Sequence, residues 1–261
     1  MPERFGIDLE EAASLLMTVL GLLPATLVVT ALEGGRPAVT TLLRRMTRWR
    51  IGLVWWLVVV AALPATTIVL ALLLGDTFRM PDAGVLANEV MSTAVAFLLV
   101  NLWEETAWSG FLQTRLERSH SFFVAAFLTA IPFGAIHLPL KIINGASSAG
   151  ELAQAFVLYV VLGLIVRPLF GLILRGSGDS VLAVALMHTM FNRSNNVDGI
   201  AADLLVGSNR SLAALIATLI LTLVIGISIR RKLTRAYRLQ LDTQHGPEPG
   251  AAELPLQRRP A

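Results

Sequence analysis

Residues 51–75, IGLVWWLVVVAALPATTIVLALLLG, run for 25 positions without a charged side chain. Seven such segments, with Arg167 the one charge within them, cover just over half of the chain: 12–32, 51–75, 90–103, 119–140, 152–174, 180–192 and 211–229. Apolar stretches of about 18 or more residues exceed the helices of a soluble core and match the thickness of a bilayer. The sequence therefore predicts an all-α, polytopic transmembrane helical bundle and excludes a soluble enzyme.

The apolar segments predict about seven membrane helices in a single transmembrane domain, residues 1–239. They are expected at 12–32, 51–74, 88–112, 121–139, 151–174, 179–194 and 211–229. The stretch 33–50, with five arginines, is expected to be a loop, with Gly34 and Gly35 ending the helix before it. Residues 240–261 contain four prolines and few large apolar residues, so we expect a disordered C-terminal tail.

The charge distribution indicates a membrane orientation and argues against nucleic-acid binding. The sequence pI is about 9.9, but the basic residues lie beside apolar segments, as in cytoplasmic loops. The segments that join successive predicted helices lie alternately on the two sides of the membrane. On this assignment, 13 basic residues lie on the same side as the C-terminus and 5 on the opposite side. We therefore expect a multi-pass protein of the cell membrane with a cytoplasmic C-terminus. The absence of cysteine excludes disulfides and thiolate nucleophiles.

Polar residues inside the apolar segments are the candidates for function, because ionisable groups at membrane depth are costly and usually face a polar cavity. Glu104 lies ~21 Å and His137 ~28 Å from the turn that joins their helices, at ~1.5 Å per residue, so the two reach similar depths. His188 and Asn192 are four residues apart and share one helical face. With Glu105 beside Glu104, we predict one buried pocket that contains two carboxylates, two imidazoles and a carboxamide.

Each of these features also has an explanation that needs no chemistry. The glutamate pair could be an interfacial cap, one histidine a packed core residue, and the other an interhelical hydrogen-bonding group. Arg167 lies eight residues before Arg175, and we expect its side chain to snorkel to the basic side of the membrane. The combination of the other polar residues at compatible depths favours the functional interpretation.

Three motifs carry a resemblance to the CAAX protease and bacteriocin-processing (CPBP, or Abi) family of intramembrane proteases. The family is marked by a Glu-Glu-x-x-x-Arg helix, a Phe-x-x-x-His helix and a His-x-x-x-Asn/Asp helix, in that order. The corresponding stretches here are EETAWSGFL at 104–112, FGAIHLP at 133–139 and HTMFN at 188–192, in a family-like core of about 90–195. One position differs, since the family's arginine falls at Ser109, which leaves Glu105 without its usual charge partner.

The resemblance implies an intramembrane endopeptidase that hydrolyses a peptide bond of a membrane-associated protein or peptide with an activated water. It implies that Glu104 is the general base and that His137 helps to hold the water. His188 and Asn192 would donate to the oxyanion, and Glu105 would belong to the same site. The expected partners are this substrate and the lipid bilayer, with no nucleic acid.

Two alternatives remain open at this point. Glu104, His137 and His188 could instead ligate a divalent metal such as zinc, with an open position for water. No HExxH spacing is present, so the sequence does not decide between metal-free and metal-assisted chemistry. The competing class is a non-proteolytic membrane protein, either an immunity or scaffold protein or a proton-coupled transporter, because Glu/His chains also relay protons. We find no internal repeat of the kind that many transporters have.

Overall fold

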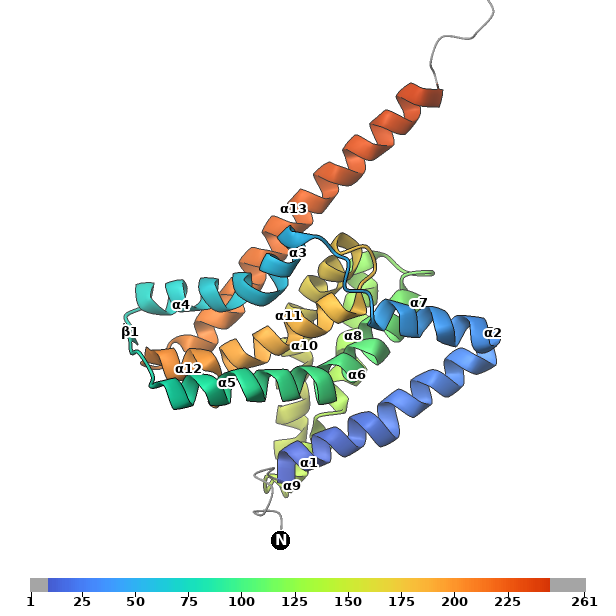
Figure 1. Cartoon of the computed structure of the whole chain (residues 1–261). Helices are drawn as coiled ribbons and strands as arrows, with labels where there is room; N and C mark the ends of the chain where they lie inside the picture. Colours follow the sequence, from blue (N-terminus) through green and yellow to red (C-terminus); the bar gives the residue numbers. More distant parts are fainter. Residues whose placement is uncertain (1–8, 245–261) are drawn as a thin grey trace, which may run out of the picture.

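The computed structural model describes residues 9–244, with side chains for residues 13–230, and this part is almost wholly helical (Figure 1). Six helices are long and apolar enough to cross a membrane, at 13–46, 53–73, 83–116, 122–143, 149–176 and 210–230. The predicted polytopic helical bundle is confirmed.

Several of the spans consist of consecutive α-helical and π-helical segments, the latter labelled η. The first contains α1 (Leu9–Leu16), η2 (Met17–Leu22) and α2 (Leu23–Met46), and the second contains α3 (Leu53–Leu57), η3 (Val58–Ala62) and α4 (Leu63–Leu73). The third contains α5 (Ala83–Val95), η4 (Ala96–Asn101), α6 (Leu102–Glu105), η5 (Thr106–Gln113) and α7 (Thr114–Leu116). The remaining helices are α8 (Phe122–Ala135), α9 (Leu138–Ile143), α10 (Ala149–Gly176), α11 (Val181–Asn195), α12 (Ile200–Leu204) and α13 (Arg210–Gln244). Strands β1 (Thr77–Phe78) and β2 (Leu205–Val206) pair antiparallel.

The sixth predicted helix, 179–194, is α11, which lies at the centre of the bundle (Figure 1). Its 15 residues are too few to cross a bilayer alone, since a span needs about 20. It contacts α4, α6, α10 and α13, and most of its residues are buried. The described part of the chain therefore has six helices of spanning length around one short central helix.

Prolines explain two of the π-helical segments. Pro24 and Pro64 each follow directly after such a segment, at the start of the next α-helix. Proline has no N–H to donate, and its ring clashes with the carbonyl one turn earlier, so the preceding turn widens.

The predicted loop 33–50 is helical as far as Met46, so that prediction was wrong for most of its length. The glycine pair does interrupt the helix, as expected: Gly34 has φ −146° and ψ 16°, and Gly35 has a positive φ of 62°, so the first helix breaks at a sharp bend and a second one follows it to Met46. Beyond the bend, Leu42 and Met46 are buried. Packing of this apolar face against the bundle stabilises the helical form of the basic segment.

Two glycines bring α8 and α10 into backbone contact. A Cβ atom at Gly163 would lie 2.8 Å from Ala130 Cβ, and one at Gly134 would lie 2.8 Å from Val160 Cγ2. Small residues allow such close approach between membrane helices. This contact fixes α10 beside the helix that carries His137.

The C-terminal helix α13 extends to Gln244, and its last turns run clear of the other helices (Figure 1). The predicted disordered tail, 240–261, therefore overlaps this helix at its start. Residues 245–261 lie outside the described residues, and so do residues 1–8 of the predicted domain 1–239.

Candidate functional site

The glutamate pair lies in a short α-helical segment, α6, between two π-helical ones, η4 and η5. A π-helical turn has one more residue than an α-helical turn, so it changes the direction in which successive side chains point. Thr114 Oγ1 donates to the carbonyl of Ser109 at 2.7 Å, within the last of these wide turns. Glu104 and Glu105 are both buried, at 7% and 0% exposure, although they are adjacent in sequence.

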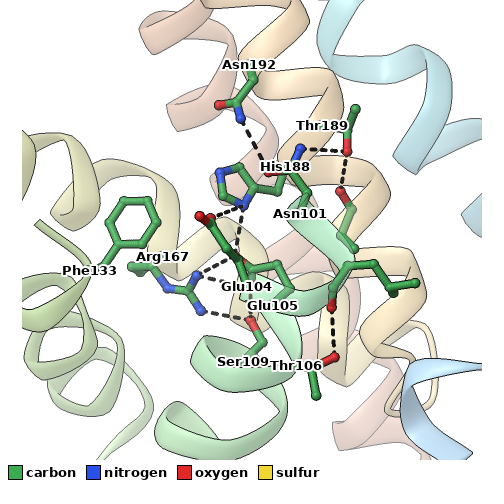
Figure 2. Close-up of polar contacts among 12 residues, drawn as sticks. Asn101, Glu104, Glu105, Thr106, Ser109, Phe133, Arg167, His188, Thr189 and Asn192 are labelled. Atoms are coloured by element: carbon green, nitrogen blue, oxygen red, sulfur yellow. Dashed lines mark hydrogen bonds and ion pairs between the residues drawn. The ribbon is translucent and has the colours of Figure 1, made fainter. Parts of the chain in front are cut away.

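Glu105 has a full set of hydrogen-bond donors. Arg167 Nη1 lies 2.8 Å from its Oε1 and 3.1 Å from its Oε2, and Ser109 Oγ donates to Oε2 at 2.5 Å. His188 Nδ1 lies 3.0 Å from Oε1 (Figure 2). A buried carboxylate with this many partners is fixed in place.

The expectation that Arg167 snorkels was wrong, and Glu105, which lacks its usual charge partner at position 109, pairs with this arginine instead. The Arg167 side chain is fully buried, and its Nη2 also donates to Ser109 Oγ at 2.8 Å and to Gln113 Oε1 at 3.3 Å. Its guanidinium carbon lies 5.7 Å and 5.3 Å from the ring centroids of Phe133 and Phe170. A buried carboxylate in an apolar bundle favours an arginine that turns inward over one that reaches the membrane surface.

Glu104 has a different environment. Thr18 Oγ1, from the first span, lies 3.4 Å from its Oε1, and His188 Nδ1 lies 4.0 Å from its Oε2. No arginine or lysine among the described side chains pairs with it. The carboxylate oxygens of Glu104 therefore have fewer hydrogen-bond donors than those of Glu105, and they can accept further hydrogen bonds.

His188 and Asn192 come from the central helix α11. The His188 ring packs against Phe170 at 5.1 Å and Phe133 at 5.9 Å between centroids. One turn later, Asn192 Nδ2 lies 3.5 Å from Asn101 Oδ1, and Asn101 Nδ2 donates to Thr189 Oγ1 at 2.9 Å (Figure 2). The sequence interpretation did not include Asn101, although it lies one turn before the glutamate pair in the same helix.

His137 lies at the break between α8 and α9, which Pro139 at the start of α9 imposes. Its Nδ1 lies 2.7 Å from the carbonyl of Phe133 and donates to it, because a carbonyl only accepts. The ring stacks on Tyr159 at 4.8 Å, and the Phe133 ring contacts both His137, at 5.0 Å, and His188. The structure therefore joins Glu104, Glu105 and His188 directly, and it connects His137 to them through one aromatic ring.

A cavity of about 460 Å³ lies between the end of α9 and the first turns of α10. Lys141, Asn144, Gln154 and Tyr159 are among the residues that line it. Tyr159 thus forms a wall of the cavity and also contacts the histidine.

The proposed zinc ligands do not form a ligand set in this arrangement. Among residues 13–230, no three histidine, aspartate or glutamate side chains lie where they could hold a common ion. The Phe133 ring contacts both imidazoles.

Comparison with known proteins agrees with the motifs. The model of a family described as type II CAAX prenyl endopeptidase Rce1-like matches residues 86–194. This range coincides with the family-like core of about 90–195 expected from the sequence, so the resemblance is confirmed. No curated protein matches the chain.

Proposed function

From the CAAX protease family match of residues 86–194, we propose that this protein is an intramembrane endopeptidase that cleaves a membrane-associated peptide or protein. The observation that carries the proposal is the difference between two adjacent buried carboxylates. Glu105 is held by Arg167, Ser109 and His188, whereas Glu104 keeps acceptor capacity close to His188. Hydrolysis needs one carboxylate that is free to take a proton, and Glu104 fits this requirement.

In the proposed reaction, Glu104 removes a proton from a water molecule, which attacks the peptide carbonyl. The same carboxyl then returns the proton to the leaving amine. His137 is proposed to hold the water, because a neutral imidazole has one nitrogen that accepts a hydrogen bond.

His188 and Asn192 are proposed to donate hydrogen bonds to the oxyanion. An amide has two N–H donors, so Asn192 has one left after its contact with Asn101. Glu105 Oε1 lies 3.0 Å from His188 Nδ1, and a carboxylate at this nitrogen orients the imidazole ring. Removing one such donor typically lowers turnover by about 10²–10³-fold.

The test is hydrolysis of a membrane-tethered fluorogenic peptide by the purified protein in proteoliposomes, with prenylated and unmodified peptides compared. Glu104→Gln is expected to lower kcat by about 10²–10⁴-fold, because the general base is lost. Glu33→Gln serves as the control, since Glu33 is exposed and pairs with Arg115, away from Glu104, Glu105 and His188.

Cleavage by Glu104→Gln at the wild-type rate would contradict the proposal and favour the non-proteolytic alternatives. A chelator arm addresses the metal alternative. Activity that is lost with chelator and restored by zinc would show that Glu104, His137 and His188 rearrange into a ligand set.

A further inference from the structure

We propose that Arg167 is a positioning residue for the reaction, and that it replaces from α10 the arginine that the family motif carries at the position of Ser109. This inference rests on the proposed function, because Arg167 acts through Glu105 and does not touch the substrate. It assigns a role to the one charged residue of α10 that lies within the apolar part of the bundle.

The contacts of Arg167 support this role. Its Nη1 contacts both oxygens of Glu105, and its Nη2 contacts the hydroxyl of Ser109, which itself donates to the same carboxylate. Arginine, serine and glutamate therefore form a closed triangle of hydrogen bonds, shown at the centre of Figure 2. Both ends of the ion pair are fully buried.

The arginine and the serine exclude a second arginine at this place. Ser109 is fully buried, and its hydroxyl lies 2.8 Å from Arg167 Nη2, so a longer side chain at 109 would occupy the space of the guanidinium. One guanidinium can thus reach Glu105 from either helix, but two cannot. A small residue at position 109 therefore leaves the space that the Arg167 guanidinium fills.

Arg167 affects the proposed reaction indirectly, because it holds Glu105, and Glu105 contacts His188. A carboxylate held against the Nδ1 of an imidazole fixes the orientation of the ring and stabilises its protonated form. Glu105 Oε1 lies 3.0 Å from His188 Nδ1 and 2.8 Å from Arg167 Nη1. Without the guanidinium, Glu105 would be a buried charge with no counter-ion, and it would protonate or turn away from His188.

A purely structural ion pair would fit the same distances, so the experiment must separate position from stability. Replacing both members of a buried pair by well-packed apolar residues of similar volume is often nearly neutral for stability, whereas removing one is not. The double variant Glu105→Met/Arg167→Met removes both charges and keeps the approximate volume. The single variant Arg167→Gln is not used alone, because loss of folding would explain its loss of activity.

The first arm measures kcat, KM and the melting temperature of this double variant in the peptide assay. If Arg167 positions the site, kcat falls about 10²-fold, as for a lost oxyanion donor, while KM and the melting temperature stay close to wild type. Arg175→Gln is the matched control, because Arg175 pairs with Glu117 between the same two parts of the chain but is 44% exposed. It should leave kcat within about twofold of wild type, since exposed ion pairs contribute little.

The second arm transposes the arginine. Ser109→Arg/Arg167→Ser returns the guanidinium to the motif position and removes it from α10. We expect the kcat of this variant to lie within about tenfold of wild type and above that of the neutral double variant. A residue that served only for packing would not give this difference between the two variants.

Two results would overturn the inference: wild-type kcat in the neutral double variant, or a folded transposed variant without turnover. If the wild-type protein itself does not cleave any of the peptides, the proposed function fails instead. The two failures are therefore distinguishable in one assay.

Discussion

His137 is held at three points by neighbouring groups. Its Nδ1 donates to the Phe133 carbonyl, one face stacks on Tyr159, and an edge contacts the Phe133 ring. An aromatic pair of this kind contributes about 0.5–1.5 kcal/mol beyond its buried area. The orientation of His137 therefore depends on a neighbour, Tyr159, that has no chemical role of its own in the proposed reaction.

Substitution of Tyr159 tests this dependence. Tyr159→Leu is expected to lower kcat about three- to tenfold, because the ring that aligns His137 is lost. Tyr159→Phe keeps the stacked ring and should retain activity close to wild type. Equal loss in both variants would assign the effect to the hydroxyl group, and loss in neither would show that the stack does not matter for turnover.

The sequence identified the polar residues of the site but not their partners. Glu104, Glu105, His188 and Asn192 could be predicted because a polar group in an apolar helix is conspicuous. The role of Arg167 was missed because its reach was judged only along its own helix, whereas its partner is 62 residues away in sequence. The absence of the motif arginine beside Glu105 was the available signal, since ionisable groups within a bilayer commonly pair with one another.

At the scale of elements, the contact of α8 with α10 depends on glycine. A Cβ at Gly163 would lie 2.8 Å from Ala130 Cβ and 3.1 Å from its Cα. The substituted helix would have to move away from α8, and with it the two residues of α10 that serve the site, Tyr159 and Arg167.

Gly163→Ala is therefore expected to destabilise the protein by about 1–3 kcal/mol, the usual cost of overpacking. Thermal unfolding in detergent measures the effect. Gly226→Ala is the matched control, because a Cβ there meets Leu172 Cδ1 at an ordinary 3.5 Å. This control should be neutral or slightly stabilising, since alanine is the better helix former. Equal melting temperatures for the two variants would contradict the close contact.

Helix positions could be read from the sequence to within a few residues, except where tertiary packing decides. The predicted helix 151–174 is observed as Ala149–Gly176, and 51–74 as Leu53–Leu73. The helical form of 33–46 was missed because a glycine pair and several arginines indicate a loop locally. The burial of Leu42 and Met46, which stabilises that helix, involves residues distant in sequence and is not visible in a local pattern.

At the scale of the whole molecule, the orientation in the membrane remains a prediction from the basic residues. The absence of cysteine allows a direct test, because one engineered cysteine is the sole reactive thiol. Ser119 and Ser147 are both exposed, in the connections α7–α8 and α9–α10 at opposite ends of the fourth span. In intact cells, a membrane-impermeant maleimide should label Ser147→Cys and should label Ser119→Cys only after permeabilisation. The reverse pattern would invert the predicted orientation.

The ion pair between Glu105 and Arg167 also has a consequence for biogenesis. The ribosome makes the carboxylate 62 residues before its counter-ion, a delay of about 3–12 s at ~5–20 residues per second. During this interval the third span carries an uncompensated acidic side chain, at a cost of about 2.5–3.5 kcal/mol on insertion scales. We therefore expect the insertion machinery to retain the third span until the fifth emerges, so that these helices enter the lipid as an assembled group.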